Sequence, residues 1–205
     1  DYINDDGYEY TLLGLKKYYD IEKEIFHHLT RLMSAENKTV IDEEIAMQYI
    51  RKQEEKQGWN FTERQLEGIF TCMNNNVTII IGYGGTGKTS AVSGMLACMD
   101  EDFDFEQCAL SGKASVNLTD ITGKEGKTIH SLLGYTPETN TYQYDEKNKL
   151  YTDLVILDEA SMVDIELALR LLRAIPNGAK LIVLGDTNQL EAIGAGNFLL
   201  DMIDS

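Results

Sequence analysis

Cysteine is scarce in this chain of 205 residues, which contains Cys72, Cys98 and Cys108 and no C-x-x-C spacing. Three thiols without paired spacing argue against a disulfide framework and against a zinc site. Proteins without disulfides are typical of reducing compartments, so we expect this protein in the cytoplasm.

Long apolar runs are also missing. No stretch approaches the roughly 20 residues that span a bilayer, and the first residues show no signal-peptide pattern. We therefore expect no association with a membrane.

Basic residues are few: 18 Lys and Arg stand against 34 Asp and Glu, which gives a formal net charge of −16. Affinity for phosphate backbones comes from clustered Lys and Arg, so this acidity argues against a protein that coats nucleic acid regardless of sequence. A narrow basic groove on an acidic body is still compatible with the composition. The length suits one sizeable α/β domain with a smaller appendage.

The most informative segment is residues 77–90, VTIIIGYGGTGKTS. Its first five residues form a β-branched apolar run, which predicts a strand buried on both faces of a parallel sheet. Residues 82–89 then match the phosphate-loop pattern G-x-x-x-x-G-K-[ST] at every fixed position. The glycines allow backbone N–H groups to face phosphate oxygens, and the helix that follows directs its N-terminus at the same phosphates.

This motif predicts a nucleoside triphosphate site. We expect Lys88 to contact the β- and γ-phosphates and the Thr89 hydroxyl to bind Mg²⁺. The predicted nucleotide-binding residues of the motif are Gly82, Gly84, Gly85, Thr86, Gly87, Lys88, Thr89 and Ser90. The alternative is a glycine-rich turn that binds nothing, and the position of the complete motif between a strand and a helix disfavours it.

The remaining pattern predicts a small, mostly helical region over residues 1–60 and an α/β domain over residues 61–205. The predicted helices cover residues 15–33, 42–56, 62–73, 113–121, 128–133, 164–174 and 196–203, and further strands cover residues 105–110, 154–157 and 181–184. Residues 135–151 are expected to form a hairpin or an ordered loop. Alternation of helices with continuous apolar strands indicates a parallel sheet that helices cover on both faces.

Two acids, Asp158 and Glu159, end the predicted strand at residues 154–157. Ligands bind at the carboxyl ends of strands in α/β sheets, so we expect Asp158 to hold the Mg²⁺ of a bound nucleotide. Glu159 is a candidate general base for the attacking water. Alternatively, both acids cap the helix that follows.

Two glutamines are candidate nucleotide contacts. Gln189 lies in GDTNQL after the last predicted strand and is a candidate sensor of the γ-phosphate, although an Asp/Asn-rich turn also explains this segment. Gln65 is either the fourth residue of a capping box that begins at Thr62 or a side chain that reads an adenine edge. Local chemistry leaves both alternatives open.

Two short segments offer candidate contacts to a nucleic-acid backbone. Ser111 and Lys113 follow a predicted strand and offer a hydroxyl and a cation, and His130 lies in a second such segment. Local chemistry by itself favours the alternative that all three are solvated loop residues.

Five segments together resemble the first motor domain of RecD-like superfamily 1 DNA helicases, related to the exonuclease V alpha subunit. They are FTERQ, GYGGTGKT, ALSGKAS with TIHSLLGY, LVILDEASMVD and LIVLGDTNQLEAIGAG. The resemblance implies a RecA-like P-loop NTPase fold. It also implies a protein that uses ATP and Mg²⁺ to translocate 5′-to-3′ on single-stranded DNA, in repair or recombination, with a nuclease or other repair subunits as candidate partners.

The same resemblance assigns roles to residues that local chemistry left open. Gln65 looks like the adenine-reading glutamine and Gln189 like the γ-phosphate sensor. Ser111, Lys113 and His130 look like residues of the DNA track. The implied catalytic residues are Lys88, Asp158, Glu159 and Gln189.

The sequence also departs from the family pattern. Leu110 and Ser111 stand where proline and threonine are usual, and Glu191 follows GDTNQL where proline is favoured, which puts a negative charge near the expected DNA side. No segment matches the second RecA-like domain, which supplies an arginine to the ATP site. We therefore expect a fragment of a longer protein that binds Mg-nucleotide and hydrolyses it slowly. The alternative is a nucleotide-dependent switch or binding module that does not translocate.

Overall fold

A five-stranded parallel sheet is the centre of the computed structural model, which describes residues 2–3, 9–10, 15–186, 194 and 196–204. The strands are β3 (Val77–Ile81), β4 (Phe105–Ala109), β5 (Lys127–Thr128), β8 (Leu154–Asp158) and β9 (Lys180–Gly185). Their order across the sheet is β3-β9-β8-β4-β5, and each neighbouring pair is parallel. All the predicted strands are confirmed, and their carboxyl ends meet at one edge.

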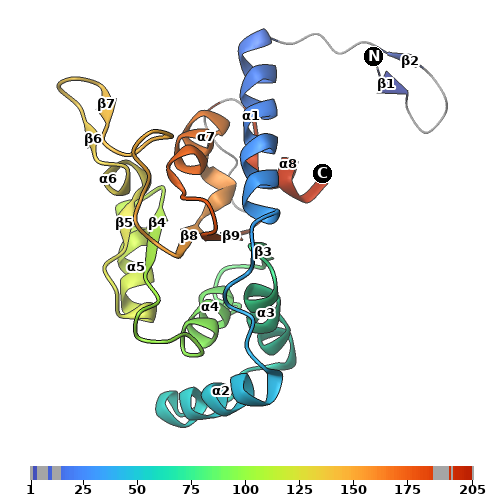
Figure 1. The fold of residues 1–205 in the computed structure, drawn as a ribbon, viewed down its shortest axis with the longest axis vertical. Helices are drawn as coiled ribbons and strands as arrows, with labels where there is room; N and C mark the ends of the chain where they lie inside the picture. The colour runs from blue at the N-terminus through green and yellow to red at the C-terminus, as the bar shows by residue number, and fades with distance from the viewer. Residues whose placement is uncertain (1, 4–8, 11–14, 187–193, 195, 205) are drawn as a thin grey trace.

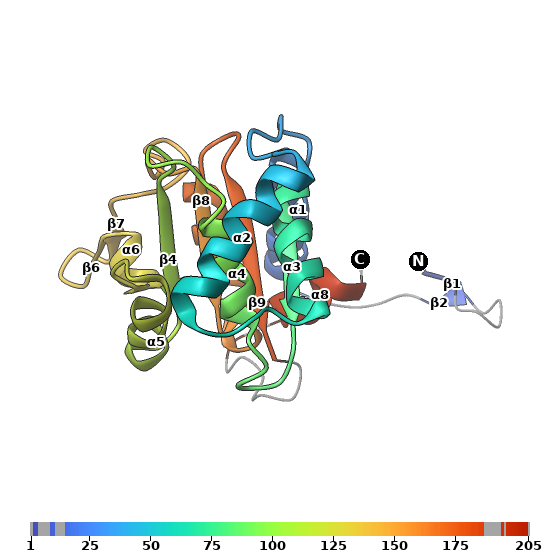
Figure 2. The same cartoon turned by 90° about the horizontal axis from the view of Figure 1, so that it is seen from below.

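Helices cover both faces of this sheet (Figure 1). One face packs against α1 (Lys16–Met33), α6 (Ile129–Leu132), α7 (Ile165–Ala174) and α8 (Phe198–Asp204). The other packs against α2 (Glu43–Gln57), α3 (Glu63–Asn74), α4 (Lys88–Leu96) and α5 (Gly112–Thr122), and Figure 2 shows α2, α3 and α4 on this side. The predicted RecA-like α/β architecture is confirmed.

Strand β8 explains why the central strands are apolar at every position. Its side chains alternate between the two cores: Leu154 and Ile156 enter one, and Val155 and Leu157 enter the other. All four are fully buried. A strand that is covered on both faces has no solvent side for polar residues.

Strand β3 differs from the sequence prediction. It lies at an edge of the sheet and pairs with β9. The prediction that it is buried on both faces is wrong, because Thr78 is the one buried residue among its five and Ile81 is 44% exposed. A short apolar run indicates a strand, but its periodicity does not specify a central position in the sheet.

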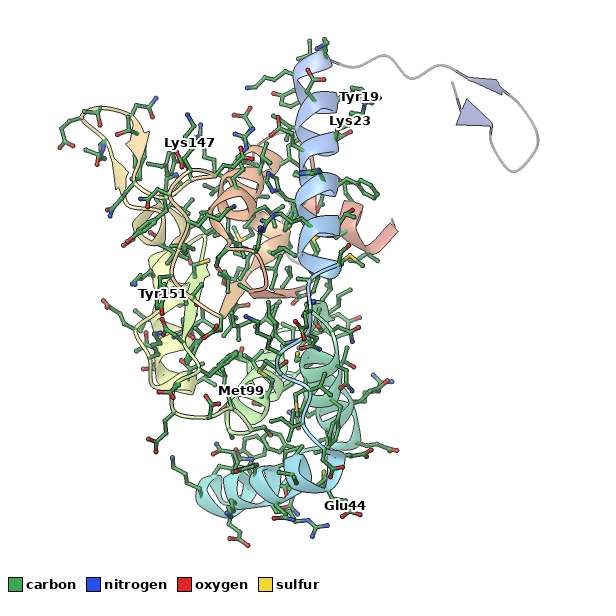
Figure 3. The ribbon with its side chains drawn as sticks, viewed as in Figure 1. Tyr19, Lys23, Glu44, Met99, Lys147 and Tyr151 are labelled. Carbon is green, nitrogen blue, oxygen red and sulfur yellow. The ribbon has the colours of Figure 1, made fainter. Side chains whose placement is uncertain are left out.

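The first two helices follow the predicted ranges within two residues, but parts of their apolar stripes face solvent. Phe26 on α1 and Ile45 and Tyr49 on α2 are all more than 40% exposed. Figure 3 shows Tyr19 and Lys23 on the outer side of α1, where the ammonium lies 4.9 Å from the ring centroid. The principal helical neighbour of α1 is α7 and that of α2 is α4, so one side of each helix is covered.

Two small antiparallel ribbons complete the fold. The strands β6 (Tyr135–Thr136) and β7 (Thr141–Tyr142) pair with each other, so a hairpin lies within residues 135–151 as predicted. The strands β1 (Tyr2–Ile3) and β2 (Glu9–Tyr10) form the second ribbon. Within the described ranges, no helix combines the length and the apolarity needed to cross a bilayer.

Candidate nucleotide-binding site

The phosphate loop connects β3 to α4 at the carboxyl edge of the sheet. Gly87, the residue before α4, has a φ of 82°, a left-handed conformation that favours glycine. A Cβ on Gly87 would also lie 2.1 Å from the side-chain nitrogen of Gln65. Glycine is therefore required here, and it allows α4 to begin at Lys88 with its unpaired N–H groups next to the loop.

The Lys88 ammonium lies within the phosphate loop. Its Nζ donates hydrogen bonds to the carbonyl oxygen atoms of Gly82 at 2.6 Å and Tyr83 at 3.0 Å. The cation is therefore held beside the backbone that phosphate oxygens would approach, as the motif predicts.

Asp186 is a member of this site that the sequence analysis did not identify. Its buried Oδ2 accepts a hydrogen bond from the N–H of Gly84 at 2.9 Å. The pairing of Ile81 with Gly185 places the residue after β9 beside the loop after β3. The sequence did contain a signal for Asp186, because it is an acid at the end of an apolar strand. The same pattern identified Asp158. Gln189, the candidate from the same segment, lies outside the described residues.

The acidic pair meets the phosphate loop in one cavity of about 480 Å³. Asp158 and Glu159 line it with the predicted loop residues Gly84, Gly85, Thr86, Gly87, Lys88, Thr89 and Ser90. Three residues of α5 that the sequence analysis did not identify, Asn117, Asp120 and Ile121, also line it. Residues that are 70 positions apart thus converge because β3 and β8 both flank β9.

Burial is the main electrostatic influence on Asp158. It raises the pKa of this carboxyl, while the N–H of Glu159, which donates to Oδ1 at 2.8 Å, lowers it. The neighbouring Glu159 carboxylate raises the pKa further and the Lys88 ammonium opposes that effect. A partly buried carboxyl beside a second carboxylate is an environment that a cation stabilises.

The donor atoms in this cavity fit Mg²⁺. The Thr89 hydroxyl and the Asp158 carboxylate are hard oxygen donors that line the same space. Mg²⁺ at nucleotide sites takes one or two protein ligands and completes its shell with phosphate oxygens and water. In the described part of the chain, no group of three His, Cys, Asp or Glu side chains could hold a metal without such additional ligands.

The alternative that the acids cap the following helix is not what the structure shows. Glu159 precedes the 3-10 helix η1 (Ala160–Met162) without any side-chain cap hydrogen bond. The N-cap of α7 is Asp164, whose Oδ1 accepts from the N–H of Leu167 at 2.9 Å. The carboxylate of Glu159 is therefore directed to other partners.

Gln65 forms the capping box at the start of α3. Its Oε1 accepts from the N–H of Thr62 at 2.9 Å, and the Thr62 hydroxyl accepts from the N–H of Gln65 at 3.3 Å. The side-chain nitrogen lies against Gly87, and the residue lines a second cavity of about 470 Å³ with Gly82 and Tyr83. Capping therefore places the amide beside the phosphate loop, so the two alternatives are compatible and the adenine contact stays a prediction.

The three candidate nucleic-acid contacts lie in two places. Ser111 is the N-cap of α5, and its hydroxyl donates to Glu159 Oε2 at 3.1 Å. Lys113 is exposed in the first turn of the same helix. His130 lies on α6, with its ring centroid 5.4 Å from that of Tyr135, and lines a separate hollow with Arg170. The DNA contacts stay predictions, but Ser111 is shown to contact the acidic pair.

Comparisons with known proteins identify the family to which this chain belongs. The sequence model of the AAA domain family matches residues 65–195. An ATP-dependent RecD2 DNA helicase of Deinococcus radiodurans is 35% identical over 141 residues, which are 68% of this chain and 19% of that protein. The RecD subunit of the RecBCD enzyme of Mycobacterium tuberculosis is 30% identical over an alignment of 166 residues, which covers 69% of this chain and 29% of that subunit.

The chain is also similar to a solved structure of two coordinating Pif1 helicases at forked double-stranded DNA. The alignment covers 70% of this chain and 37% of the Pif1 chain, with 25% sequence identity and a TM-score of 0.48. This chain spans less than a third of the length of the two curated relatives described above. The family model covers most of the chain and includes the phosphate loop and the acidic pair. The chain belongs to the AAA domain family, among its RecD-like helicase relatives.

Proposed function

We propose that this chain is the ATP-binding part of an ATP-dependent DNA helicase that translocates 5′-to-3′ on single-stranded DNA. The observation that carries the proposal is the cavity in which Lys88, Asp158 and Glu159 converge. The relationship to RecD and RecD2 proteins supports DNA as the substrate. The proposed helicase acts in DNA repair or recombination in the cytoplasm, with a nuclease or other repair subunits as partners.

Five candidate residues each have one proposed task. Lys88 exchanges the carbonyls of Gly82 and Tyr83 for the β- and γ-phosphate oxygens. Thr89 and Asp158 hold Mg²⁺, which neutralises charge on the phosphates when bound. Glu159 orients the attacking water and accepts its proton. Gln189 senses the γ-phosphate.

The chain divides by task as well. Residues 61–205 are proposed to be the first motor domain, and residues 1–60 are a helical region whose α1 and α2 brace opposite faces of its sheet. No arginine is among the described residues that line the cavity of the acidic pair. An arginine supplied from outside accelerates phosphoryl transfer by about 10³–10⁵-fold. We therefore expect residues 1–205 to bind Mg-nucleotide and hydrolyse it slowly.

ATP hydrolysis by the natural full-length protein tests the proposal, with and without a single-stranded oligonucleotide. We expect DNA to stimulate hydrolysis and Lys88→Ala to abolish it, because the ammonium is the cation at the transferred phosphate. Lys56→Ala, on the exposed side of α2, is the matched control and keeps the wild-type rate. Strand displacement on substrates with 5′ or 3′ overhangs then gives the direction.

The net charge of −16 favours one competing function, a nucleotide-dependent switch. A switch predicts nucleotide affinity that depends on Lys88 but hydrolysis that is indifferent to DNA. Hydrolysis that is indifferent to DNA would reject the proposed translocation on DNA. Unwinding from 3′ overhangs alone would reject the proposed 5′-to-3′ direction.

A further inference from the structure

One hydrogen bond joins the predicted DNA track to the predicted general base. The Ser111 hydroxyl donates to Glu159 Oε2 at 3.1 Å, across two loops that are 48 residues apart. The contact follows from strand register, because β4 and β8 are adjacent and parallel with Ala109 opposite Asp158. Ser111, two residues beyond β4, and Glu159, the residue after β8, therefore lie close together.

Glu159 has an unusual backbone for a glutamate. Its φ of 54° and ψ of 37° place it in the left-handed region, which among the described non-glycine residues it shares with Asn140. Such conformations cost free energy and occur where surrounding contacts impose them, often at functional sites. Two hydrogen bonds anchor the residue: its N–H donates to Asp158 Oδ1, and its carbonyl accepts from the N–H of Met162.

The Ser111 hydroxyl has no second proton to offer. Its oxygen accepts from the N–H of Ala114 at 3.2 Å, and its single proton is directed to Glu159. A phosphate oxygen that bound this hydroxyl would have to replace the carboxylate as the acceptor of its hydrogen bond. Occupation of Ser111 by a backbone phosphate and its bond to Glu159 therefore exclude each other.

The bond to Ser111 restrains the carboxylate of Glu159. Its carboxylate lines the cavity of the phosphate loop, where an attacking water would need one of its oxygens. The bond to Ser111 occupies one lone-pair site on Oε2 and fixes the rotation of the carboxylate. Loss of the bond to Ser111 frees this lone-pair site and allows the carboxylate to rotate.

We propose that Ser111 is a positioning residue that restrains Glu159 until a DNA phosphate takes its hydroxyl and releases the carboxylate toward the attacking water. The inference rests on the proposed function and supplies a physical link by which DNA stimulates ATP hydrolysis. Ser111 acts through Glu159 and does not itself react.

Four variants of the natural full-length protein test this link through the ratio of ATP hydrolysis with DNA to hydrolysis without it. Ser111→Ala removes the donor and the helix cap, whereas Ser111→Asp keeps a cap acceptor but has no proton to donate. Ser111→Thr keeps both functions. Ser115→Ala is the matched control on the same helix, because that hydroxyl donates to the carbonyl of Gly112 at 2.8 Å.

We expect the DNA-free rate to rise about three- to tenfold in Ser111→Ala and in Ser111→Asp, the factor that corresponds to one lost hydrogen bond. The stimulation ratio falls correspondingly in both, Ser111→Thr retains it, and Ser115→Ala does not change it. A structural loss of the cap would instead lower both rates together and would spare Ser111→Asp. Thermal unfolding of each variant monitors the fold.

An unchanged ratio in both Ser111→Ala and Ser111→Asp would overturn the inference while the stimulated wild type leaves the proposed function intact. An equal loss in Ser115→Ala would overturn it too, because the effect would then belong to α5 in general. A wild type that DNA does not stimulate would overturn the proposed function and, with it, this inference.

Discussion

At the scale of single residues, one substitution separates the capping role of Gln65 from its predicted adenine contact. Its Oε1 completes the capping box and its nitrogen lies against Gly87. Gln65→Glu keeps the acceptor that the box needs and loses the amide donor. We expect stability within about 0.5 kcal/mol of wild type and an ATP affinity that falls about tenfold more than the GTP affinity, because one adenine contact is lost.

Nucleotide titrations with ATP and GTP in parallel measure this effect, because the added negative charge weakens both nucleotides alike. Thr62→Ala is the counterpart: it removes the cap at a cost of about 1 kcal/mol and leaves the ATP-to-GTP ratio unchanged. Equal losses for ATP and GTP in Gln65→Glu would contradict an adenine contact.

The buried side chain of Lys180 makes the stability of the fold depend on pH. Its side chain is 2% exposed, and Nζ donates to the carbonyls of Cys72, Met73 and Asn75 at the end of α3. Burial lowers its pKa from 10.5 to about 8. Between these values the unfolded chain binds this proton and the folded chain has lost it, so the stability contribution rises with pH across that window and is absent below it.

We expect the free energy of unfolding of wild type to gain about 1–3 kcal/mol over that of Lys180→Met between pH 8 and pH 10.5. Urea denaturation at several pH values measures both proteins, and the subtraction removes the titration of other groups. A difference that stays constant or shrinks with rising pH would show that the pKa is not lowered.

At the scale of elements, Arg31 fastens α1 to the end of α7. Its guanidinium donates to Asn177 Oδ1 at 2.7 Å and to the carbonyls of Leu172 and Ile175, each at 3.1 Å. The two carbonyls belong to the last turn and the C-cap of α7, where no intrahelical donor is available. A side chain from the N-terminal region thus caps a helix of the α/β domain.

Arg31→Ala is expected to lower the free energy of unfolding by about 1.5–3 kcal/mol, because hydrogen bonds from a charged donor are lost. Arg31→Lys restores part of this, since an ammonium cannot reproduce the planar fork. Arg51→Ala, exposed on α2, is the control and changes stability by less than about 0.5 kcal/mol. Chemical denaturation compares the three, and an Arg31→Ala protein as stable as the control would refute the capping role.

At the scale of the whole molecule, the cysteines report on both cores. Cys108 lies in one core, Cys72 and Cys98 lie in the other, and all three are free and buried. Burial raises the pKa of Cys72 to about 12 and that of Cys98 to about 11. The reactive thiolate is therefore scarce in the folded protein.

We expect the three thiols to resist alkylation at pH 8 and to react together when the protein unfolds. Labelling across a denaturant series, read by mass spectrometry, should coincide with loss of helical signal because both cores share one sheet. A single thiol that reacts well before the others would instead reveal a region that opens independently.

Local pattern was sufficient for most elements of this fold. The helix over residues 62–73 was predicted within one residue, because Thr62 and Gln65 form a local capping signal. The apolar faces of the first two helices are wider than the sides that the fold covers, since periodicity identifies residues that can be buried and not the neighbour that buries them. Tyr19 and Phe26 accordingly face solvent on α1.

The sequence by itself determined the phosphate loop and the alternation of strands and helices, because the residues that create them are consecutive or a few positions apart. The tertiary structure alone decided that β9 separates β3 from β8. That order brings Asp186 to Gly84 and, through β4 beside β8, Ser111 to Glu159, over 102 and 48 residues respectively. The pattern of a single strand does not encode its neighbours, so these contacts follow from strand order and register.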